Sequence, residues 1–225
     1  MALPNRIGRL RLPVLCFVVS KAAVKDGDVE KAVSEAIAGG ATMVRISQEG
    51  MAAGELLELA QKVHGVTKGK ALFVVDDRVD VAVAVDADGV ELPDTGLPTR
   101  AARAQIGKHA VVGRSVYDAE TAQHATREGA DYVTVGPIYR GAAKSDKPAG
   151  VGLLKEISKD SDLPMLAAGG ITADKVGEVI KAGAAGVAVS LAIAGADDPR
   201  AAAEALAQAI KAAWQARPEE VAATA

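Results

Sequence analysis

Short apolar segments recur at regular intervals along this chain, and stretches of helical composition lie between them. Each segment holds about 5–7 residues of nearly continuous apolar character, which is the pattern of a strand buried on both faces of a parallel sheet. We therefore expect an α/β fold. The expected strands are Leu15–Ser20, Thr42–Ser47, Ala71–Asp77, Gly89–Pro93, Ala110–Val116, Tyr132–Ile138, Pro164–Gly170 and Gly186–Ser190.

The segments between the expected strands are rich in Ala, Glu and Lys, which favour helices. Asp28 and Thr172 stand where N-cap residues are expected, and Gly39, Gly40 and Gly183 stand where helices should end. The clearest expected helices are Asp28–Ala38, Met51–Val66, Asp118–Glu128 and Pro199–Ala216.

Repeated strand–helix units in a chain of 225 residues fit a (β/α)8 (TIM) barrel. The competing arrangement is an open doubly wound sheet, which usually has fewer repeats, and no Gly-x-Gly-x-x-Gly motif follows the first strand. The similar phrases AGGATMV, REGADYV and KAGAAGV each join a helix end, a Gly-Ala turn and the next strand, so they reflect barrel periodicity. We predict one barrel over residues 1–216 and a flexible C-terminal tail over 217–225.

Composition argues against several classes of partner. A formal net charge of −3 and an aromatic content of 3% give no general attraction for nucleic acid or for anionic membranes. Cys16 is the only cysteine, which excludes an internal disulfide and a Cys-rich zinc site. No apolar run is long enough to span a bilayer, and the apolar stretch after the basic start is too short for a signal peptide. We expect a cytoplasmic protein.

In a barrel of this type, chemistry lies at the carboxyl ends of the strands. Gly169 and Gly170 follow the seventh expected strand and precede a helix, while Val189 and Ser190 end the eighth. Glycines let backbone N–H groups approach an anion, and a helix N-terminus adds a favourable dipole. The alternative is that these glycines only make tight turns. We predict a phosphate-binding site at these four residues.

The polar loop after the sixth expected strand is a second candidate. It carries Arg140, Lys144 and Lys147. Such a loop could close over an anionic substrate and exclude water. An ordinary solvated loop has the same composition, so both interpretations stay open.

Acidic residues end the third and fourth expected strands. Asp76 and Asp77 could hold Mg²⁺ if further oxygen ligands join them, or one of them could pair with Arg78 or cap the next helix. Glu91 lies among apolar neighbours, and burial could bring it into the range of a general base. It could equally form an ion pair with Arg114.

Four phrases between Leu72 and Ile193 carry a resemblance to a known family. They are VVDDRVDVAVAVDADGVEL, GRSVYDAETAQHATREGADYVTVGPIY, AAGGITADKV and AGAAGVAVS. In order and spacing they resemble the thiamin phosphate synthase/TenI family of (β/α)8 barrels. The resemblance implies a small ligand that is a phosphorylated thiazole or pyrimidine piece of thiamin.

Several residues match functional positions of that family. The resemblance makes Asp77 the metal-binding aspartate, with Mg²⁺ as the metal, and Lys144 a catalytic candidate. Gly169 and Gly170 match the phosphate loop. The substrate-binding candidates at the strand ends are Arg45, Ser47, Arg114, Ser115 and Tyr139.

The departures from the family pattern bear on the reaction. Synthases of the family typically end strand two with Gln-x-Arg-x-Lys, where this chain has Arg45, Ser47 and Glu49. Gly96 stands where a second metal-binding aspartate belongs. Pro137 stands where tautomerases of the family carry a histidine.

Three hypotheses follow. The favoured one is TenI-like acid–base chemistry of the thiazole tautomerase type, with Glu91 or Asp76 moving the proton. The first alternative is a thiamin phosphate synthase that joins pyrimidine pyrophosphate to thiazole phosphate and releases pyrophosphate. The second is a member that binds thiamin phosphate without catalysis. A homodimer is left open.

Overall fold

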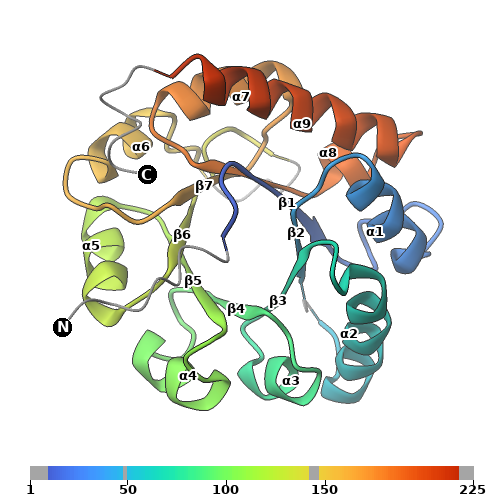
Figure 1. Cartoon of the computed structure of the whole chain (residues 1–225). Coiled ribbons are helices and arrows are strands. Elements are labelled where there is room, and N and C mark those ends of the chain that lie inside the picture. Colours follow the sequence, from blue (N-terminus) through green and yellow to red (C-terminus); the bar gives the residue numbers. More distant parts are fainter. Residues whose placement is uncertain (1–9, 48–49, 142–146, 218–225) are drawn as a thin grey trace.

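The chain folds into one closed parallel barrel (Figure 1). Its strands pair in sequence order, and β8 pairs with β1. This computed structural model describes residues 10–47, 50–141 and 147–217. The strands are β1 (Val14–Val19), β2 (Met43–Ile46), β3 (Leu72–Asp76), β4 (Gly89–Leu92), β5 (Val111–Val116), β6 (Tyr132–Val135), β7 (Met165–Ala168) and β8 (Gly186–Val189). The predicted (β/α)8 barrel is confirmed, and each strand lies within the predicted segment or one residue beyond it.

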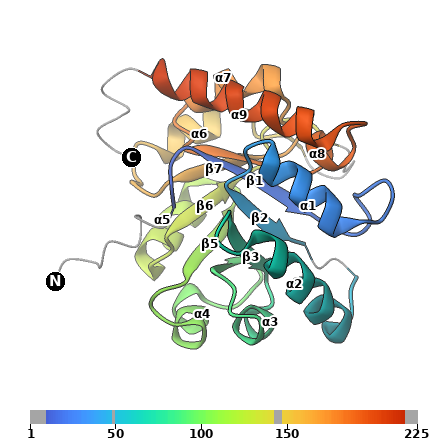
Figure 2. The same cartoon turned by 45° about the vertical axis from the view of Figure 1, so that its right-hand side comes forward.

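Helices surround the barrel (Figures 1 and 2). The last of them packs against both α7 and α1, so it closes the outer ring where the first and last repeats meet. The helices are α1 (Val29–Ala38), α2 (Ala53–Thr67), α3 (Val79–Ala84), α4 (Thr99–Ile106), α5 (Ala119–Glu128), α6 (Gly152–Ile157), α7 (Ala173–Lys181), α8 (Leu191–Ala194) and α9 (Pro199–Gln215).

The helix caps follow the predictions in part. Asp28 caps α1, because its carboxylate accepts the backbone N–H of Lys31 at 3.0 Å. Thr172 occupies the N-cap position of α7, but its hydroxyl donates to the Asp174 carboxylate instead of accepting a backbone N–H. Gly39 ends α1 without a positive φ. A Cβ there would lie 2.5 Å from the Arg200 carbonyl oxygen of α9, so close helix packing explains this glycine.

The residues that face the barrel axis change character along the barrel. Near its amino end they form an apolar cluster that includes Val14, Cys16 and Met43. Burial raises the pKa of the Cys16 thiol to about 12, so this cysteine is a core residue rather than a nucleophile. Side chains alternate between the two faces of a strand, so residues two positions further along also face the barrel axis. These residues include Arg45 on β2 and Asp76 on β3. The interior of the barrel is therefore apolar near the amino ends of the strands and polar near their carboxyl ends.

A recurring hydrogen bond ties neighbouring strands together at the amino end of the barrel. In each case the residue before an even-numbered strand accepts the backbone N–H of the second residue of the preceding strand. The pairs are Leu15 N–H to Thr42 Oγ1 (3.2 Å), Phe73 N–H to Asp88 Oδ2 (2.9 Å) and Val112 N–H to Asp131 Oδ2 (2.8 Å). Thr42 and Asp131 lie in two of the repeated phrases, AGGATMV and REGADYV, whereas the third phrase has Ala185 at that position.

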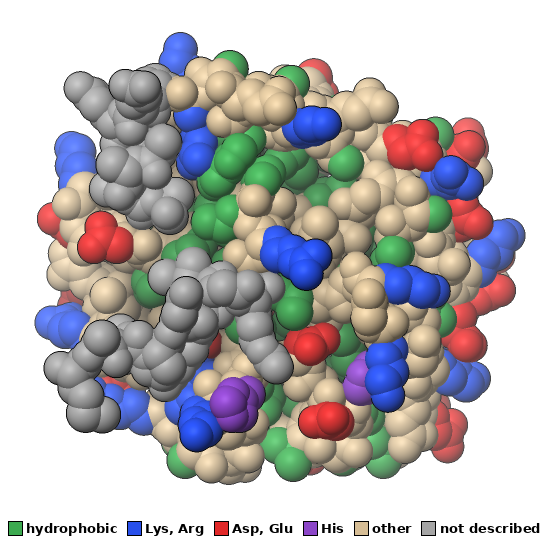
Figure 3. Space-filling model, viewed as in Figure 1, with side chains coloured by type: hydrophobic (Ala, Val, Ile, Leu, Met, Phe, Trp, Pro, Cys, Tyr) green, Lys and Arg blue, Asp and Glu red, His purple; other side chains and the backbone are tan. Residues whose placement is uncertain are grey.

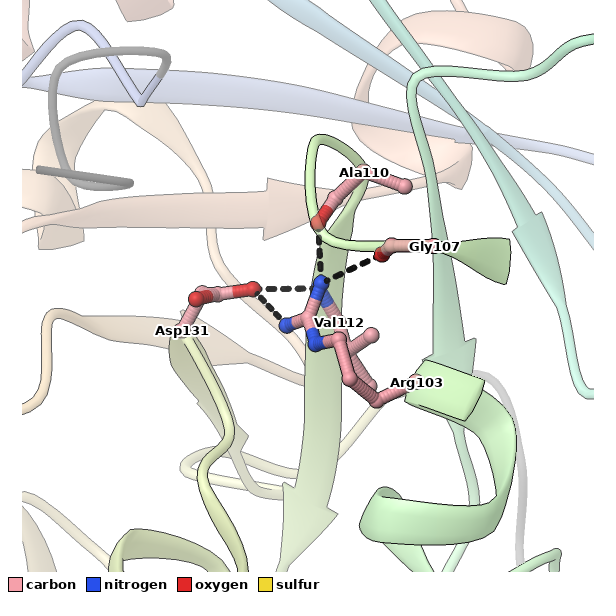
Figure 4. Close-up of polar contacts among 5 residues, drawn as sticks. All are labelled: Arg103, Gly107, Ala110, Val112 and Asp131. Atoms are coloured by element: carbon pink, nitrogen blue, oxygen red, sulfur yellow. Dashed lines mark hydrogen bonds and ion pairs between the residues drawn. The ribbon is translucent and has the colours of Figure 1, made fainter. Parts of the chain in front are cut away.

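The acceptor before β6 is also part of an ion pair (Figure 4). Arg103 of α4 donates to the Asp131 carboxylate and to the carbonyl oxygens of Ala110 and Gly107. Its side chain is 15% exposed and that of Asp131 is 7% exposed. One buried carboxylate therefore holds a helix, a loop and two strands together.

The outer surface carries both signs of charge. On the part of the face in Figure 3 that the structure describes, Lys and Arg side chains are interspersed with Asp and Glu. None of the described helices is long and apolar enough to cross a membrane.

We predict that Asp131→Ala destabilises the protein by about 3 kcal/mol, because it leaves the Arg103 guanidinium and the Val112 N–H buried without their acceptor. Urea denaturation monitored by circular dichroism measures this. The matched control is Asp197→Ala, which removes an exposed partner of Lys25 and should leave the midpoint unchanged. Equal midpoints for the two variants would show that the Asp131 contacts are not stabilising.

Candidate functional site

A cavity of about 840 Å³ opens at the carboxyl ends of β1, β2, β7 and β8. The ionisable side chains among its described lining residues are all cationic, so the cavity suits an anionic ligand. The lining residues are Val18, Ser20, Arg45, Ser47, Pro137, Arg140, Gly141, Ala168, Gly169, Gly170, Ile171, Thr172, Lys175, Ala188, Val189, Ser190, Leu191 and Ala192.

The predicted phosphate-binding residues all line this cavity. Gly169 and Gly170 have φ values of +87° and +64°, and they precede helix α7. A Cβ on Gly170 would lie 2.6 Å from the Arg140 carbonyl oxygen, so both conformation and packing require glycine there. Val189 and Ser190 end β8 across the same cavity. These four residues bring backbone and a helix N-terminus to one place, as an anion site needs.

The sequence did not point to Lys175, yet it lines the cavity. Its ammonium donates to the Gly170 carbonyl oxygen at 3.0 Å and lies 4.8 Å from the centroid of the Tyr139 ring. The Tyr139 hydroxyl in turn donates to Glu178 at 2.6 Å. Tyr139, predicted to bind substrate, is absent from the described cavity lining and lies against Lys175. The signal that could have found Lys175 is its position in the first turn of a helix opened by Gly-Gly.

Arg45 has a dual position, because it lines the cavity and also reaches into the polar layer of the barrel. Its Nε lies 3.1 Å from Asp76 Oδ1 and its Nη1 lies 3.3 Å from Glu91 Oε1. The Ser115 hydroxyl donates to the same Glu91 oxygen at 3.0 Å. The predicted residues Arg45, Asp76, Glu91 and Ser115 therefore form one cluster, which we call the Arg45 cluster.

The charges in this cluster influence one another. Burial raises the pKa of Asp76 to about 6, with the Arg45 charge opposing the shift and the Glu91 and Asp77 charges adding to it. Burial disfavours the charge on Arg45, but the Asp76 and Glu91 carboxylates outweigh that effect and raise its pKa. Arg45 therefore stays a cation inside the barrel.

The suggested ion pair between Glu91 and Arg114 is not formed in the structure. Glu91 is opposite Gly113 in the β4–β5 register, whereas Arg114 is opposite Leu92, so the two side chains lie on different faces of the sheet. Arg114 donates to the carbonyl oxygens of Leu97 and Asp94 at 2.7 and 2.9 Å. It stabilises the loop after β4 instead of lining the cavity.

The region around Asp77 does not fit a Mg²⁺ site. No three His, Cys, Asp or Glu side chains within the described ranges come together as potential metal ligands. Asp76 and Glu91 both face the Arg45 guanidinium. Asp77 has a φ of +58°, and its Oδ1 lies near Gly96, where a Cβ would be 2.9 Å away. Arg78 forms an ion pair with Asp80, and its Nε donates to Asp80 Oδ1 at 2.8 Å.

A second cavity of about 540 Å³ continues from the first over the ends of β1 and β2. Ser20 and Ser47 line both, so the predicted residue Ser47 lies where the two cavities meet. Met51 and Ala22 give the second cavity apolar walls, and Lys21 and Glu55 add one charge of each sign. Lys144, predicted to be catalytic, lies outside the described residues.

Comparisons with known proteins agree over most of the chain. The family described as thiamine monophosphate synthase (TMP-TENI) matches residues 15–193. A thiamine-phosphate synthase of Haloarcula marismortui is 41% identical over 202 residues, which cover 87% of this chain and 96% of that protein. One from Alkaliphilus oremlandii is 35% identical over 88% of this chain and 95% of its own length.

A solved structure extends this similarity to the backbone. The thiamine phosphate pyrophosphorylase of Pyrococcus furiosus superposes with a TM-score of 0.82 at 36% identity, covering 91% of this chain and 98% of that chain. Other barrels superpose with lower identity, such as the native KDPGal structure at 19% identity and a TM-score of 0.68. The latter similarity shows the fold alone.

We predict a pH-dependent stability that originates at Asp76. Its pKa is about 6 in the folded chain against 3.8 for an ordinary aspartate, so the folded state binds this proton more tightly than the unfolded state does. By linkage, this group makes stability fall as the pH rises from about 4 to about 6. Urea midpoints across this range should show that component in the wild type and not in Asp76→Asn. Asp94→Asn, an exposed change at the same rim, should keep the wild-type profile.

Superimposable profiles for the wild type and Asp76→Asn would contradict this assignment. Because the comparison uses the difference in slope, a uniform loss of stability in the variant does not obscure it.

Proposed function

The chain belongs to the thiamine monophosphate synthase family, and we propose that it is a thiamine-phosphate-synthase-type transferase that joins a pyrimidine to a phosphorylated thiazole. The observation that carries this proposal is the identity of 41% over 96% of the Haloarcula marismortui thiamine-phosphate synthase. The tautomerase-type chemistry favoured on the sequence has less support, because the relatives described above are named as synthases or as the pyrophosphorylase.

The cationic cavity supports the thiazole-phosphate half of this proposal. The phosphate would lie against the backbone of Gly169, Gly170 and Ser190, where the α7 N-terminus favours negative charge. Lys175 and Arg140 line the same cavity and add cationic side chains. The phosphate would thereby fix the position of the thiazole ring at the mouth of the barrel.

The pyrimidine half would extend toward Ser47 and the second cavity, whose Met51 and Ala22 offer apolar contact. Joining the two rings expels pyrophosphate, and this departure is fast only when cations neutralise the growing charge. The described cations that line the cavity are Arg45, Arg140 and Lys175. Ser47 and Glu49 stand where the family resemblance implies cations. Each lost contact slows such a step by roughly 10²–10³-fold.

We predict that the wild-type chain forms thiamin phosphate from pyrimidine pyrophosphate and thiazole phosphate, at a rate at least about 100-fold below that of a family member that has cations at the positions of Ser47 and Glu49. Chromatography with fluorescence detection of the oxidised product measures this. A heat-inactivated sample and a reaction without thiazole phosphate are the controls. Absence of product at high enzyme concentration contradicts the proposal and makes the thiazole carboxylate phosphate the next substrate to test.

Lys175→Met should weaken binding of thiazole phosphate by about tenfold, because it removes a charged hydrogen-bond donor from the cavity. Binding of the unphosphorylated thiazole alcohol should stay the same. Titration calorimetry with both compounds measures the difference, and Lys181→Met at the exposed last turn of α7 is the matched control. Equal losses for the two compounds would show that Lys175 does not recognise the phosphate.

A further inference from the structure

The Arg45 cluster joins a guanidinium from β2 to carboxylates from β3 and β4. Asp76 and Glu91 are register partners on adjacent parallel strands, so their side chains leave the sheet side by side and on the same face. Glu91 is 2% exposed and the side chain of Asp76 is 22% exposed. Two carboxylates that are shielded from solvent and lie side by side repel each other strongly, so they need a cation between them.

The chain supplies that cation from its own sequence. The Arg45 side chain, 13% exposed, presents Nε to Asp76 and Nη1 to Glu91, at 3.1 and 3.3 Å. The same Nη1 also lies 3.4 Å from the Thr134 hydroxyl oxygen. Arg45 therefore spans the barrel from β2 to β4 and β6, and its position is fixed on three sides.

Glu91 Oε2 and the Tyr132 hydroxyl both lie beside Gly113, where a Cβ would be 2.1 and 2.5 Å from them. Both atoms are buried, and burial together with the Glu91 carboxylate raises the pKa of the Tyr132 phenol. A glycine at this position of β5 makes the room that the carboxylate and the phenol occupy.

We propose that the Arg45 guanidinium takes the place of a divalent cation at the ends of β2, β3 and β4, so that this chain holds Asp76 and Glu91 without a metal, and that removing the guanidinium converts these carboxylates into a cation-binding pair. The inference goes beyond the proposed reaction, because it concerns which cation the carboxylates hold.

The decisive measurement uses Mn²⁺ alone as the probe and the full chain as the sample. The electron paramagnetic resonance signal of free Mn²⁺ loses intensity when the ion binds a protein. The wild type should leave the signal unchanged, whereas Arg45→Gln should bind Mn²⁺ saturably. Arg45→Gln combined with Asp76→Asn should lose that binding. Arg114→Gln is the matched control, because its guanidinium donates to backbone carbonyls and not to the two carboxylates.

Thermal unfolding provides a second readout. Millimolar Mg²⁺ should leave the melting temperature of the wild type and Arg114→Gln unchanged, and should raise that of Arg45→Gln by about 5 °C if the ion reaches roughly 100 times its Kd. If Arg45→Gln does not fold without added ion, refolding in Mg²⁺ but not in EDTA is the supporting result. Arg45→Lys keeps a cation and should behave as the wild type does.

Saturable Mn²⁺ binding by the wild type that Asp76→Asn abolishes would overturn the proposal. So would an Arg45→Gln variant that folds and ignores the ion. Neither result depends on turnover, so an absence of thiamin phosphate product would refute the proposed function while leaving this inference to its own test.

Discussion

The contact between Arg45 and the carboxylates of Asp76 and Glu91 organises the upper half of the barrel. It fills the space among the strand ends that a TIM barrel otherwise packs with apolar side chains. Removing one partner from such a network leaves an uncompensated buried charge, which costs more than the pair itself contributes. These charges also act on the apolar cluster near the amino end of the barrel, because Arg45, Glu91 and Asp76 all affect the pKa of the Cys16 thiol. The site and the core are therefore one electrostatic unit.

At the amino end of the barrel, side-chain hydrogen bonds fix the register of neighbouring strands. Thr42, Asp88 and Asp131 each accept a backbone N–H from the neighbouring strand. A slip of one residue would invert the faces of a strand and move Arg45 out of the barrel. The hydrogen bonds at the amino end of the barrel thus help to preserve the geometry of the Arg45 cluster near its carboxyl end.

The sequence was enough to predict the barrel and the position of its strands, because strands buried on both faces appear as continuous apolar runs. It also brought Gly169, Gly170, Val189 and Ser190 to one site, since strand order and strand ends locate them. The partner of Glu91 could not be predicted this way. Glu91 pairs with Arg45 and not with Arg114 because of the inter-strand register. Arg114 is opposite Leu92, so its side chain lies on the other face of the sheet from Glu91. Lys175 was missed because its reach into the cavity depends on the path of the chain between β7 and α7.

Positive and negative side chains lie on opposite sides of the barrel mouth, and this distribution favours one orientation of a charged ligand. Arg140 and Lys175 line the cavity at β7 and β8, whereas the carboxylates of the Arg45 cluster come from β3 and β4. Arg45 belongs to both sides, but its guanidinium faces two carboxylates, so the cluster as a whole has an excess of negative charge when all three groups are ionised. An anionic group is therefore attracted to the glycine loop and repelled from the opposite rim. This asymmetry explains how one end of a phosphorylated ring compound would be selected by charge. The other end would meet the second cavity, where Lys21 and Glu55, one charge of each sign, lie with Ser47 and Met51.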